Sequence, residues 1–365
     1  MIRNYLKIAV RNLWKHKTFT IVNIVGLAVA FGATLLLSLT AFHELSFDRF
    51  HVNKQSLYLL YTEGHEPGKA DISPSMPVPL SPTLKKEYPE ILHASRFGYL
   101  GNSVLRYKDH EFNYDIRTVD PDFIEMFSFP LQQGDPKKAL QDQGSIVLTE
   151  KVARSVFGQE PPIGRTVQIK TGEEWKPYIV SGIAGDFPEN STLQFSALIR
   201  FENFPWYKAN QNKWDNRNHE VYVQLAPQTS QTAFEQKTIK FIHKYFDSAV
   251  IQMKLDGGVP DKDGEYMRLR MVPMPDLHFA SFGASVRISR FYPYLLLLIG
   301  AFILFIASVN FVNLSMGRAF TRAREIGVRK VLGAARKQIL FQFWGEAIVI
   351  CTASLAAGIA LAFIF

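Results

Sequence analysis

Three long uncharged runs dominate the pattern of apolar and polar positions along the chain. They cover Thr18–Phe42, Phe291–Gly317 and Ala347–Phe365, with 25, 27 and 19 residues. As helices rising about 1.5 Å per residue they would measure roughly 38, 40 and 28 Å, against a bilayer hydrocarbon core of about 30 Å. We therefore predict membrane-spanning helices at residues 18–42, 291–317 and 338–365. The third run is barely long enough and the sequence stops inside it, so we expect the front part of a longer protein.

The first seventeen residues show a different pattern. Basic residues recur every four positions, beside a stripe of apolar residues. The basic members are Arg3, Lys7, Arg11 and Lys15, and Trp14 belongs to the apolar stripe. An amphipathic helix of this kind lies in the membrane interface, with its cations against anionic headgroups. We predict such a helix at residues 1–17, either as a positively charged anchor or as an elbow that moves with the first span.

Residues 43–290, between the first two spans, alternate between strand and helix patterns. Apolar and polar residues alternate on both sides of Lys108–His110, which predicts a hairpin. Thr149 as a cap and Gly158 as a stop predict a helix between them. Further strands are predicted at Gln55–Thr62, Ser145–Leu148, Thr166–Ile169, Tyr178–Ile183, Leu193–Ile199, Glu220–Leu225 and Met267–Val272, and further helices at Ser81–Tyr88 and Thr229–Phe246. The segment reads as an α+β domain, large enough to hold together by its own core as two lobes.

Charge sets the predicted topology. Residues 1–42 carry five Lys/Arg and no acidic residue, and residues 318–337 carry seven Lys/Arg and one Glu, whereas residues 43–290 carry 29 Lys/Arg and 31 Asp/Glu. By the positive-inside rule, the N-terminus and the loop at 318–337 are cytosolic and residues 43–290 lie outside. The net charge of +8 therefore indicates topology rather than a nucleic-acid surface. The first run exceeds the length of a signal-peptide core, which favours a retained signal anchor.

Enzyme and metal signatures are missing from the sequence. No G-x-x-x-x-G-K-[ST] occurs, so we assign no nucleotide hydrolysis to this chain. The histidines outside the spans are scattered without an H-x-x-x-H pair, which favours hydrogen-bonded or solvated side chains over a zinc site. Asp120, Asp122, Asp186 and Glu189 lie in turn-like contexts that Asp favours for backbone reasons. The single cysteine, Cys351, falls in the third span, so no disulfide supports the outside domain. We predict no catalytic, cofactor-binding or metal-binding residues.

The loop between the second and third spans contains a distinctive motif of charged residues and glycines. The pattern R-x-x-E-I-G-x-R-K-x-x-G-A runs over Arg322–Ala334. Glu325 and Arg329 are four residues apart and can share a helix face. Gly327 and Gly333 interrupt that face, which allows another surface to approach the backbone closely. We expect residues 318–337 to form a compact helical loop suited to docking a cytosolic protein.

This loop motif, continued by Gln342 and Glu346, resembles the permease subunits of the MacB/FtsX superfamily of ABC transporters. Four further segments resemble the family's outside core domain in content and order. They are DPDFIEMFSFPLQQGDP (Asp120–Pro136), IVLTEKVARSVFG (Ile146–Gly158), PIGRTV (Pro162–Val167) and GIAGDFPENSTLQF (Gly182–Phe195). The length of the outside domain is closer to MacB-type members than to FtsX cell-division proteins. Such permeases have four spans, or eight when two halves are fused, so this sequence resembles a truncated one.

The resemblance implies a multi-pass protein of the bacterial inner membrane with a MacB periplasmic-core-like domain. ATP and Mg²⁺ would bind a separate ABC ATPase subunit, and this chain would carry no cofactor. Closure of the ATPase would be passed along the spans to move the outside domain (mechanotransmission), for export or efflux. The residues that the resemblance assigns to the coupling contact are Arg322, Glu325, Ile326, Gly327, Arg329, Lys330 and Gly333. We also expect a dimer of permease halves and a periplasmic partner. We expect no binding of nucleic acid.

Two other classes of protein share part of this pattern. A transmembrane sensor also places an outside domain between two spans, but a long helical cytosolic region usually follows its second span. A short basic loop and a third apolar run follow here instead. A membrane-anchored enzyme is supported by no motif. Further spans after Phe365 would favour the permease, and a kinase or methyl-accepting region would favour the sensor.

Overall fold

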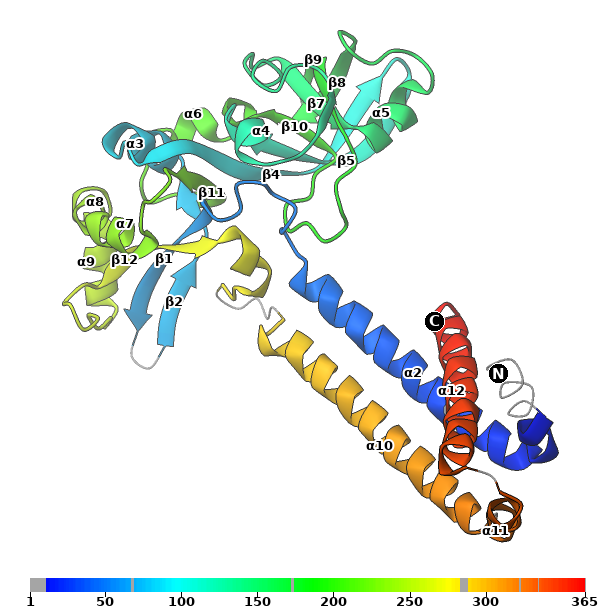
Figure 1. The fold of residues 1–365 in the computed structure, drawn as a ribbon. Coiled ribbons are helices and arrows are strands. Elements are labelled where there is room, and N and C mark those ends of the chain that lie inside the picture. The colour runs from blue at the N-terminus through cyan, green and yellow to red at the C-terminus, as the bar shows by residue number, and fades with distance from the viewer. Residues whose placement is uncertain are drawn as a thin grey trace. The chain divides into compact units, whose positions relative to one another are not determined.

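The computed structural model describes residues 11–66, 69–171, 174–282, 288–321, 323–333 and 335–364. The chain divides into two compact units (Figure 1). We call residues 1–46 and 289–365 the helical unit and residues 47–288 the sheet unit. Long helices beside a large mixed domain are the predicted fold class, which is thereby confirmed.

The helical unit contains three helices that are long and apolar enough to cross a membrane, among the residues described. They are α2 (Lys17–Leu45), α10 (Phe291–Thr321) and α12 (Arg336–Ala362). A short helix, α11 (Ala323–Val331), connects α10 to α12. The runs of apolar residues explain all three long helices, because a helix satisfies its backbone hydrogen bonds internally and needs no water.

Helix α2 packs against both of the other long helices. A Cβ atom on Gly358 of α12 would lie 2.8 Å from the Ala28 carbonyl oxygen of α2, so these two backbones touch. On α10, the Gly300 carbonyl oxygen accepts a hydrogen bond from the Thr34 hydroxyl at 3.1 Å. Small residues and short interhelical hydrogen bonds are the usual means by which membrane helices approach each other.

The sheet unit is built on one twelve-stranded mixed sheet with the order β12-β1-β11-β4-β5-β10-β7-β9-β6. Strands β2, β3 and β8 pair at its sides. The strands are β1 (Leu57–Glu66), β2 (Lys69–Ser73), β3 (Met76–Pro77), β4 (Ile91–Tyr107), β5 (His110–Val119), β6 (Leu131–Gln133), β7 (Ser145–Thr149), β8 (Thr166–Thr171), β9 (Glu174–Ala184), β10 (Ala197–Arg200), β11 (Arg217–Leu225) and β12 (Met267–Pro273). Parallel pairing occurs between β5 and β10 and between β7 and β9.

Strand β4 is shared by two lobes (Figure 1). Its first half pairs with β11, and its second half pairs with β5 and β8. The register with β5 shifts between Tyr99 and Asn102, where Gly101 adopts the left-handed φ of 87°. Each lobe has its own core, one containing Leu60 and Phe241, the other Ile146 and Tyr178. The unit is therefore two-lobed around a continuous strand.

Short helices cover the sheet. They are α3 (Leu80–Glu87), α4 (Phe123–Met126), α5 (Glu150–Phe157), α6 (Tyr207–Asn210), α7 (Gln231–Lys237), α8 (Ile239–Tyr245) and α9 (Asp247–Leu255), with 3-10 turns η1 (Phe201–Asn203) and η2 (Met274–Phe279). The predicted cap of α5 is present, because the Thr149 hydroxyl accepts from the Val152 N–H at 3.4 Å and Gly158 follows at a φ of 59°.

Two helix predictions were wrong in their boundaries. Helix α3 begins at Leu80 rather than after Ser81, because Leu80 and Leu84, four residues apart, are both fully buried in one core. The predicted helix Thr229–Phe246 is two helices, α7 and α8, which break at Thr238. The Thr238 hydroxyl donates to the Glu235 carbonyl oxygen at 2.8 Å, a local bond that competes with the continuous helix.

Candidate functional site

Helix α11 carries the central part of the predicted coupling motif. The coupling residues that the structure describes on it or just after it are Ile326, Gly327, Lys330 and Gly333. Glu325 and Arg329 also belong to α11, but their side chains lie outside the described part of the chain, as does the whole of Arg322. The predicted Glu325–Arg329 pair therefore stays a prediction.

The two glycines of the motif differ in backbone conformation. Gly333 has a φ of 89°, and its N–H donates to the Lys330 carbonyl oxygen at 3.1 Å. It therefore serves the turn after α11, where a residue with a side chain would be strained. At Gly327 a Cβ atom would meet nothing within 4 Å, so the backbone there faces open space. A Cβ atom at Gly333 would also meet nothing within 4 Å, so both backbones are open and the close approach of another surface stays a prediction.

An apolar stripe on α11 was missed by the sequence reasoning. The side chains of Val328, Val331 and Leu332 are 56%, 89% and 79% exposed. They follow the spacing i, i+3, i+4, which places them on one side of the helical segment, with Leu332 just after α11. Lys330 is exposed toward the opposite side, because it is two residues from both Val328 and Leu332. Exposed apolar side chains grouped in this way are suited to a protein partner that buries them. The spacing of these aliphatic residues is a signal that the sequence contains.

A hydrogen bond joins the N-terminal helical segment to α12. The Asn12 side-chain nitrogen donates to the Glu346 carboxylate at 2.5 Å, and Gln342 approaches the same oxygen at 3.4 Å. Glu346 is only 6% exposed. A carboxylate buried at a membrane helix is costly unless it is hydrogen-bonded, which the Asn12 amide provides. The sequence singled out Glu346 and Gln342 as part of the motif, but gave no sign of Asn12.

Arg318, in the last turn of α10, is the next basic residue of this region. Its guanidinium carbon lies 4.6 Å from the ring centre of Phe19 on α2, a cation–π geometry. Arg318, Phe19 and Glu346 line one hollow of about 410 Å³. The N-terminal ends of α2 and α12 and the C-terminal end of α10 thus meet around charged side chains.

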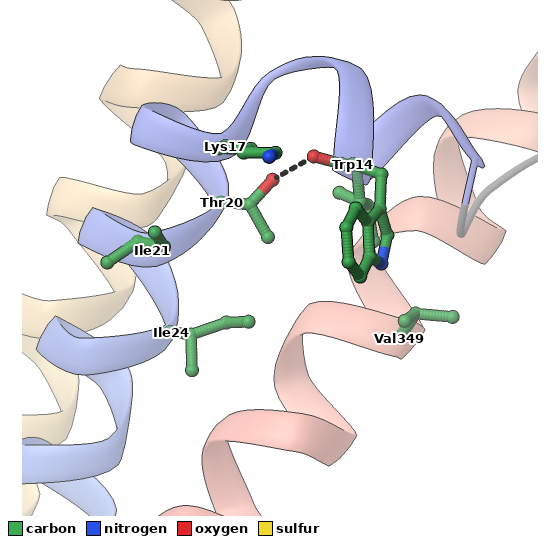
Figure 2. Close-up of a pocket in the computed structure, with 7 residues that line it drawn as sticks. Trp14, Lys17, Thr20, Ile21, Ile24 and Val349 are labelled. Atoms are coloured by element: carbon green, nitrogen blue, oxygen red, sulfur yellow. Dashed lines mark hydrogen bonds between the residues drawn. The ribbon is translucent and has the colours of Figure 1, made fainter.

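The N-terminal segment also borders a second hollow, of about 400 Å³ (Figure 2). Of the predicted interface residues, Arg11, Trp14 and Lys15 are described, whereas Arg3 and Lys7 lie outside the described residues. Trp14 is 70% exposed, and the Lys17 ammonium lies 5.3 Å from its ring centre. Ile24 of α2 and Val349 of α12 complete the apolar wall (Figure 2). An apolar hollow with a cation at its edge matches an anionic lipid.

In the sheet unit, the first residues after α2 are fixed to two later segments. The ring of Phe47 stacks on that of His278 in η2, with 3.6 Å between centroids and 10° between planes. Asp48 adopts a φ of 55°, and its carboxylate accepts hydrogen bonds from the Thr192 N–H at 2.8 Å and the Thr192 hydroxyl at 2.5 Å. The segments that lead to α2 and toward α10 are therefore tied together at one end of this unit.

Among the described histidines and carboxylates of the sheet unit, His51 and Asp120 have structural partners. His51 is fully buried, which lowers its pKa to about 4, and its Nδ1 accepts from the Ser128 N–H at 3.2 Å. Asp120 is buried in a two-pronged pair with Arg96, whose Nε and Nη2 lie 2.9 and 2.5 Å from its oxygens. No group of three potential metal ligands occurs among the residues searched, which are those the structure describes.

Sequence comparisons agree with this arrangement. Residues 20–240 match the MacB-like periplasmic core domain family, and residues 297–365 match the FtsX-like permease C-terminal family. The chain is 25% identical to the pyoverdine export ATP-binding/permease protein PvdT of Pseudomonas aeruginosa, over 72% of this chain and 36% of that protein. It is 23% identical to the macrolide export ATP-binding/permease protein MacB of Burkholderia thailandensis, over 71% of this chain and 36% of that protein.

Over a shorter segment the likeness is stronger, at 37% identity to Escherichia coli MacB across 76 residues, 21% of this chain and 12% of that protein. The chain thus spans about a third of the length of the first relatives it matches. Among solved structures, a domain of a protein described as a permease from Porphyromonas gingivalis aligns with a TM-score of 0.51. That alignment has 19% identity and covers 62% of this chain and 92% of the other, which shows a shared fold of the sheet unit.

Proposed function

The chain belongs to the MacB/FtsX family of ABC-transporter permeases, and from this membership we propose that it transmits movement from a separate ATPase subunit to its sheet unit. In this proposal the ATPase docks on α11, and its ATP-driven closure displaces α10 and α12. The permease assignment follows from the comparisons, whereas the coupling role, the partner and the cargo are proposed.

The observation that carries the proposal is the uncovered apolar stripe of α11. The side chains of Val331 and Leu332 are 89% and 79% exposed. Truncating apolar residues at the centre of an interface costs far more binding free energy than truncating residues at its rim. An exposed apolar stripe is therefore suited to the centre of a protein contact. Lys330 adds a charge that would orient the partner.

A displacement of α11 would reach α2 by two packed routes. Helix α10 contacts α2 at Thr34 and Gly300, and α12 contacts it at Gly32 and Gly358. The Asn12–Glu346 hydrogen bond adds a tie between the N-terminal segment and α12. Because only Ser46 separates the end of α2 from Phe47, movement of α2 would reach the first residue of the sheet unit through the chain itself.

Several expectations from the sequence belong to the same proposal. ATP and Mg²⁺ would bind the partner subunit, and this chain would supply neither a catalytic residue nor a cofactor site. The helical unit would lie in the bacterial inner membrane with the N-terminus in the cytosol and the sheet unit in the periplasm. A second permease half and a periplasmic partner would complete the assembly. The two relatives are described as pyoverdine export and macrolide export proteins, which supports export or efflux as the process that this chain serves.

Site-specific photocrosslinking tests the docking site. A photoreactive phenylalanine analogue at Val331, in native membranes, is expected to crosslink to a protein that carries a nucleotide-binding P-loop, identified by mass spectrometry. The Lys330→Glu substitution should reduce the crosslinking yield, because α11 would lose the positive charge that orients the partner.

The matched control places the same analogue at Leu255, an exposed aliphatic residue of α9 in the sheet unit (75% exposed). This position should give no crosslink to the ATPase. Crosslinks from Val331 only to lipid, or equal ATPase crosslinking from both positions, would contradict docking on α11.

A further inference from the structure

The hollow beside Trp14 lies where the helical path breaks at the start of α2. Residues 11–15 are helical and α2 begins at Lys17, but His16 between them has a φ of −122° and a ψ of 58°, outside the helical region. The chain bends there, so that Leu13 is buried in one apolar cluster with Ile350 of α12. Trp14 lies between the start of α2 and α12 (Figure 2). The hollow of about 400 Å³ is therefore bounded by both sides of the bend and by α12.

The walls of this hollow are apolar and open on the surface of the helical unit. Ile21 and Ile24 of α2 lie on one side and Val349 of α12 on the other (Figure 2), and Ile21 is 58% exposed. The Thr20 hydroxyl already donates to two backbone carbonyl oxygens, at 3.0 and 3.1 Å. Both α2 and α12 are long and apolar enough to cross a membrane. An empty apolar hollow on such helices forfeits van der Waals contacts, which an acyl chain of the bilayer would restore.

Lys17 is the one charged residue among the described residues that line the hollow. Its exposed side chain places the ammonium 5.3 Å from the ring centre of Trp14, beside the apolar walls. No acidic residue precedes Glu44 in the sequence. The one acidic residue of α12, Glu346, lines the other hollow and accepts from the Asn12 amide. We therefore expect an anion from outside the chain to neutralise the charge of Lys17.

We infer that this hollow binds one anionic diacyl phospholipid, with an acyl chain between Ile24 and Val349 and the phosphate against the Lys17 ammonium. Apolar walls that end at a cation select a ligand with an apolar chain and an anionic head. A zwitterionic lipid offers the same chain, but its own cation competes with Lys17 for the phosphate. The site differs from a general attraction of basic residues for headgroups, because it requires the hollow as well as the charge. It does not rest on the proposed coupling role, because lipid binding can be measured without an ATPase.

Quenching of Trp14 fluorescence by brominated lipids tests the inference, because bromine quenches tryptophan only at close approach. The full chain is reconstituted in phosphatidylcholine vesicles that contain increasing fractions of brominated phosphatidylglycerol, brominated phosphatidylcholine or a brominated fatty acid. Subtracting the signal of the Trp14→Phe chain isolates Trp14 from the other tryptophans. We expect phosphatidylglycerol to bind about fivefold more tightly than phosphatidylcholine, which is the effect of one basic residue at an anionic headgroup.

Equal quenching by brominated phosphatidylglycerol and brominated phosphatidylcholine would show ordinary contact with the bilayer and would overturn the site. Stronger quenching by the fatty acid than by phosphatidylglycerol would overturn its assignment to a phospholipid.

Two pairs of substitutions separate the hollow from general surface charge. Lys17→Gln should weaken phosphatidylglycerol binding by about fivefold, whereas Lys337→Gln, at an exposed position of α12 that does not line the hollow, should leave it unchanged. Val349→Phe narrows the hollow without changing any charge and should also weaken binding. Its matched control is Ile348→Phe, at the adjacent position, which is 61% exposed and does not line the hollow.

Circular dichroism checks that each variant folds, and Ile24→Phe narrows the hollow from α2 if Val349→Phe does not fold. Equal losses from Lys17→Gln and Lys337→Gln would contradict the headgroup contact. Full quenching in a folded variant with a narrowed hollow would contradict the acyl-chain site.

Discussion

Gly32 of α2 and Gly358 of α12 meet backbone to backbone, so that a Cβ atom on Gly358 would lie 3.0 Å from the Gly32 nitrogen. Ala28 and Ser354 precede them by four residues on their respective helices, and both are buried. This is the small-xxx-small arrangement that brings membrane helices close enough for extensive van der Waals contact. The same crossing carries one of the two proposed routes from α11 to α2.

Gly358→Ala is expected to destabilise the helical unit by about 1–3 kcal/mol, because the added methyl group would collide with the Ala28 carbonyl and the Phe31 side chain. Unfolding of the full chain in mixed micelles, followed by circular dichroism, measures the loss. Gly345→Ala on the same helix is the matched control, since a Cβ there meets nothing within 4 Å. Equal stability of the two variants would show that the backbones do not touch.

The Asn12–Glu346 hydrogen bond is expected to contribute a coupling free energy of about 1–3 kcal/mol, because one partner is a buried carboxylate. A double-mutant cycle with Asn12→Ala and Glu346→Ala measures it by unfolding in micelles. A parallel cycle with Gln342→Ala should give a smaller coupling, since that contact is 3.4 Å long. Additive effects of Asn12→Ala and Glu346→Ala would argue against the bond.

The sheet unit is expected to lose stability as pH falls from about 6.5 to 4. Burial lowers the pKa of His51 in the folded state to about 4, below its unfolded value, so the unfolded chain binds the extra proton in this interval. The contribution of His51 to the free energy of unfolding is fully present above the pKa of the unfolded chain and amounts to at most about 3 kcal/mol. Chemical denaturation at several pH values, monitored by tryptophan fluorescence, measures it. His51→Asn should show a shallower pH dependence; identical slopes would exclude His51 as the cause.

Membrane topology can be tested with single cysteines in a Cys351→Ser background. Lys262→Cys lies in an exposed loop of the sheet unit, and Lys330→Cys is exposed on α11. A membrane-impermeant maleimide applied to spheroplasts should label the first and reach the second only after permeabilisation, since the positive-inside rule places the basic loop in the cytosol. Labelling of Lys330→Cys in intact spheroplasts would reverse the proposed orientation.

Much of the local structure could be predicted from the sequence, because short-range signals determine it. The hairpin around Lys108–His110 follows from alternating residues, and α5 follows from its Thr149 cap and its Gly158 stop. Helix α9 (Asp247–Leu255) was missed, since it has no fully buried residue and shows little separation of apolar and polar faces. Its Val250 and Met253 reach the core only through packing that a local pattern does not reveal.

The candidate sites were predicted less well, because their parts are distant in sequence. The motif on α11 was recognised as a local pattern. The Asn12–Glu346 bond, however, joins residues 334 positions apart, which no local pattern reveals.

The stack of Phe47 on His278 closes the sheet unit on itself, because it joins the first residue of the unit to its last described helical turn. A domain whose two ends meet can be inserted between consecutive helices at little cost in chain entropy, as a long loop with nearby ends would be. This geometry explains how two membrane helices that are consecutive in the helical unit can have a whole globular domain inserted between them. It also identifies the Phe47–His278 junction as the place to graft a different domain, or a short linker, onto the same membrane helices.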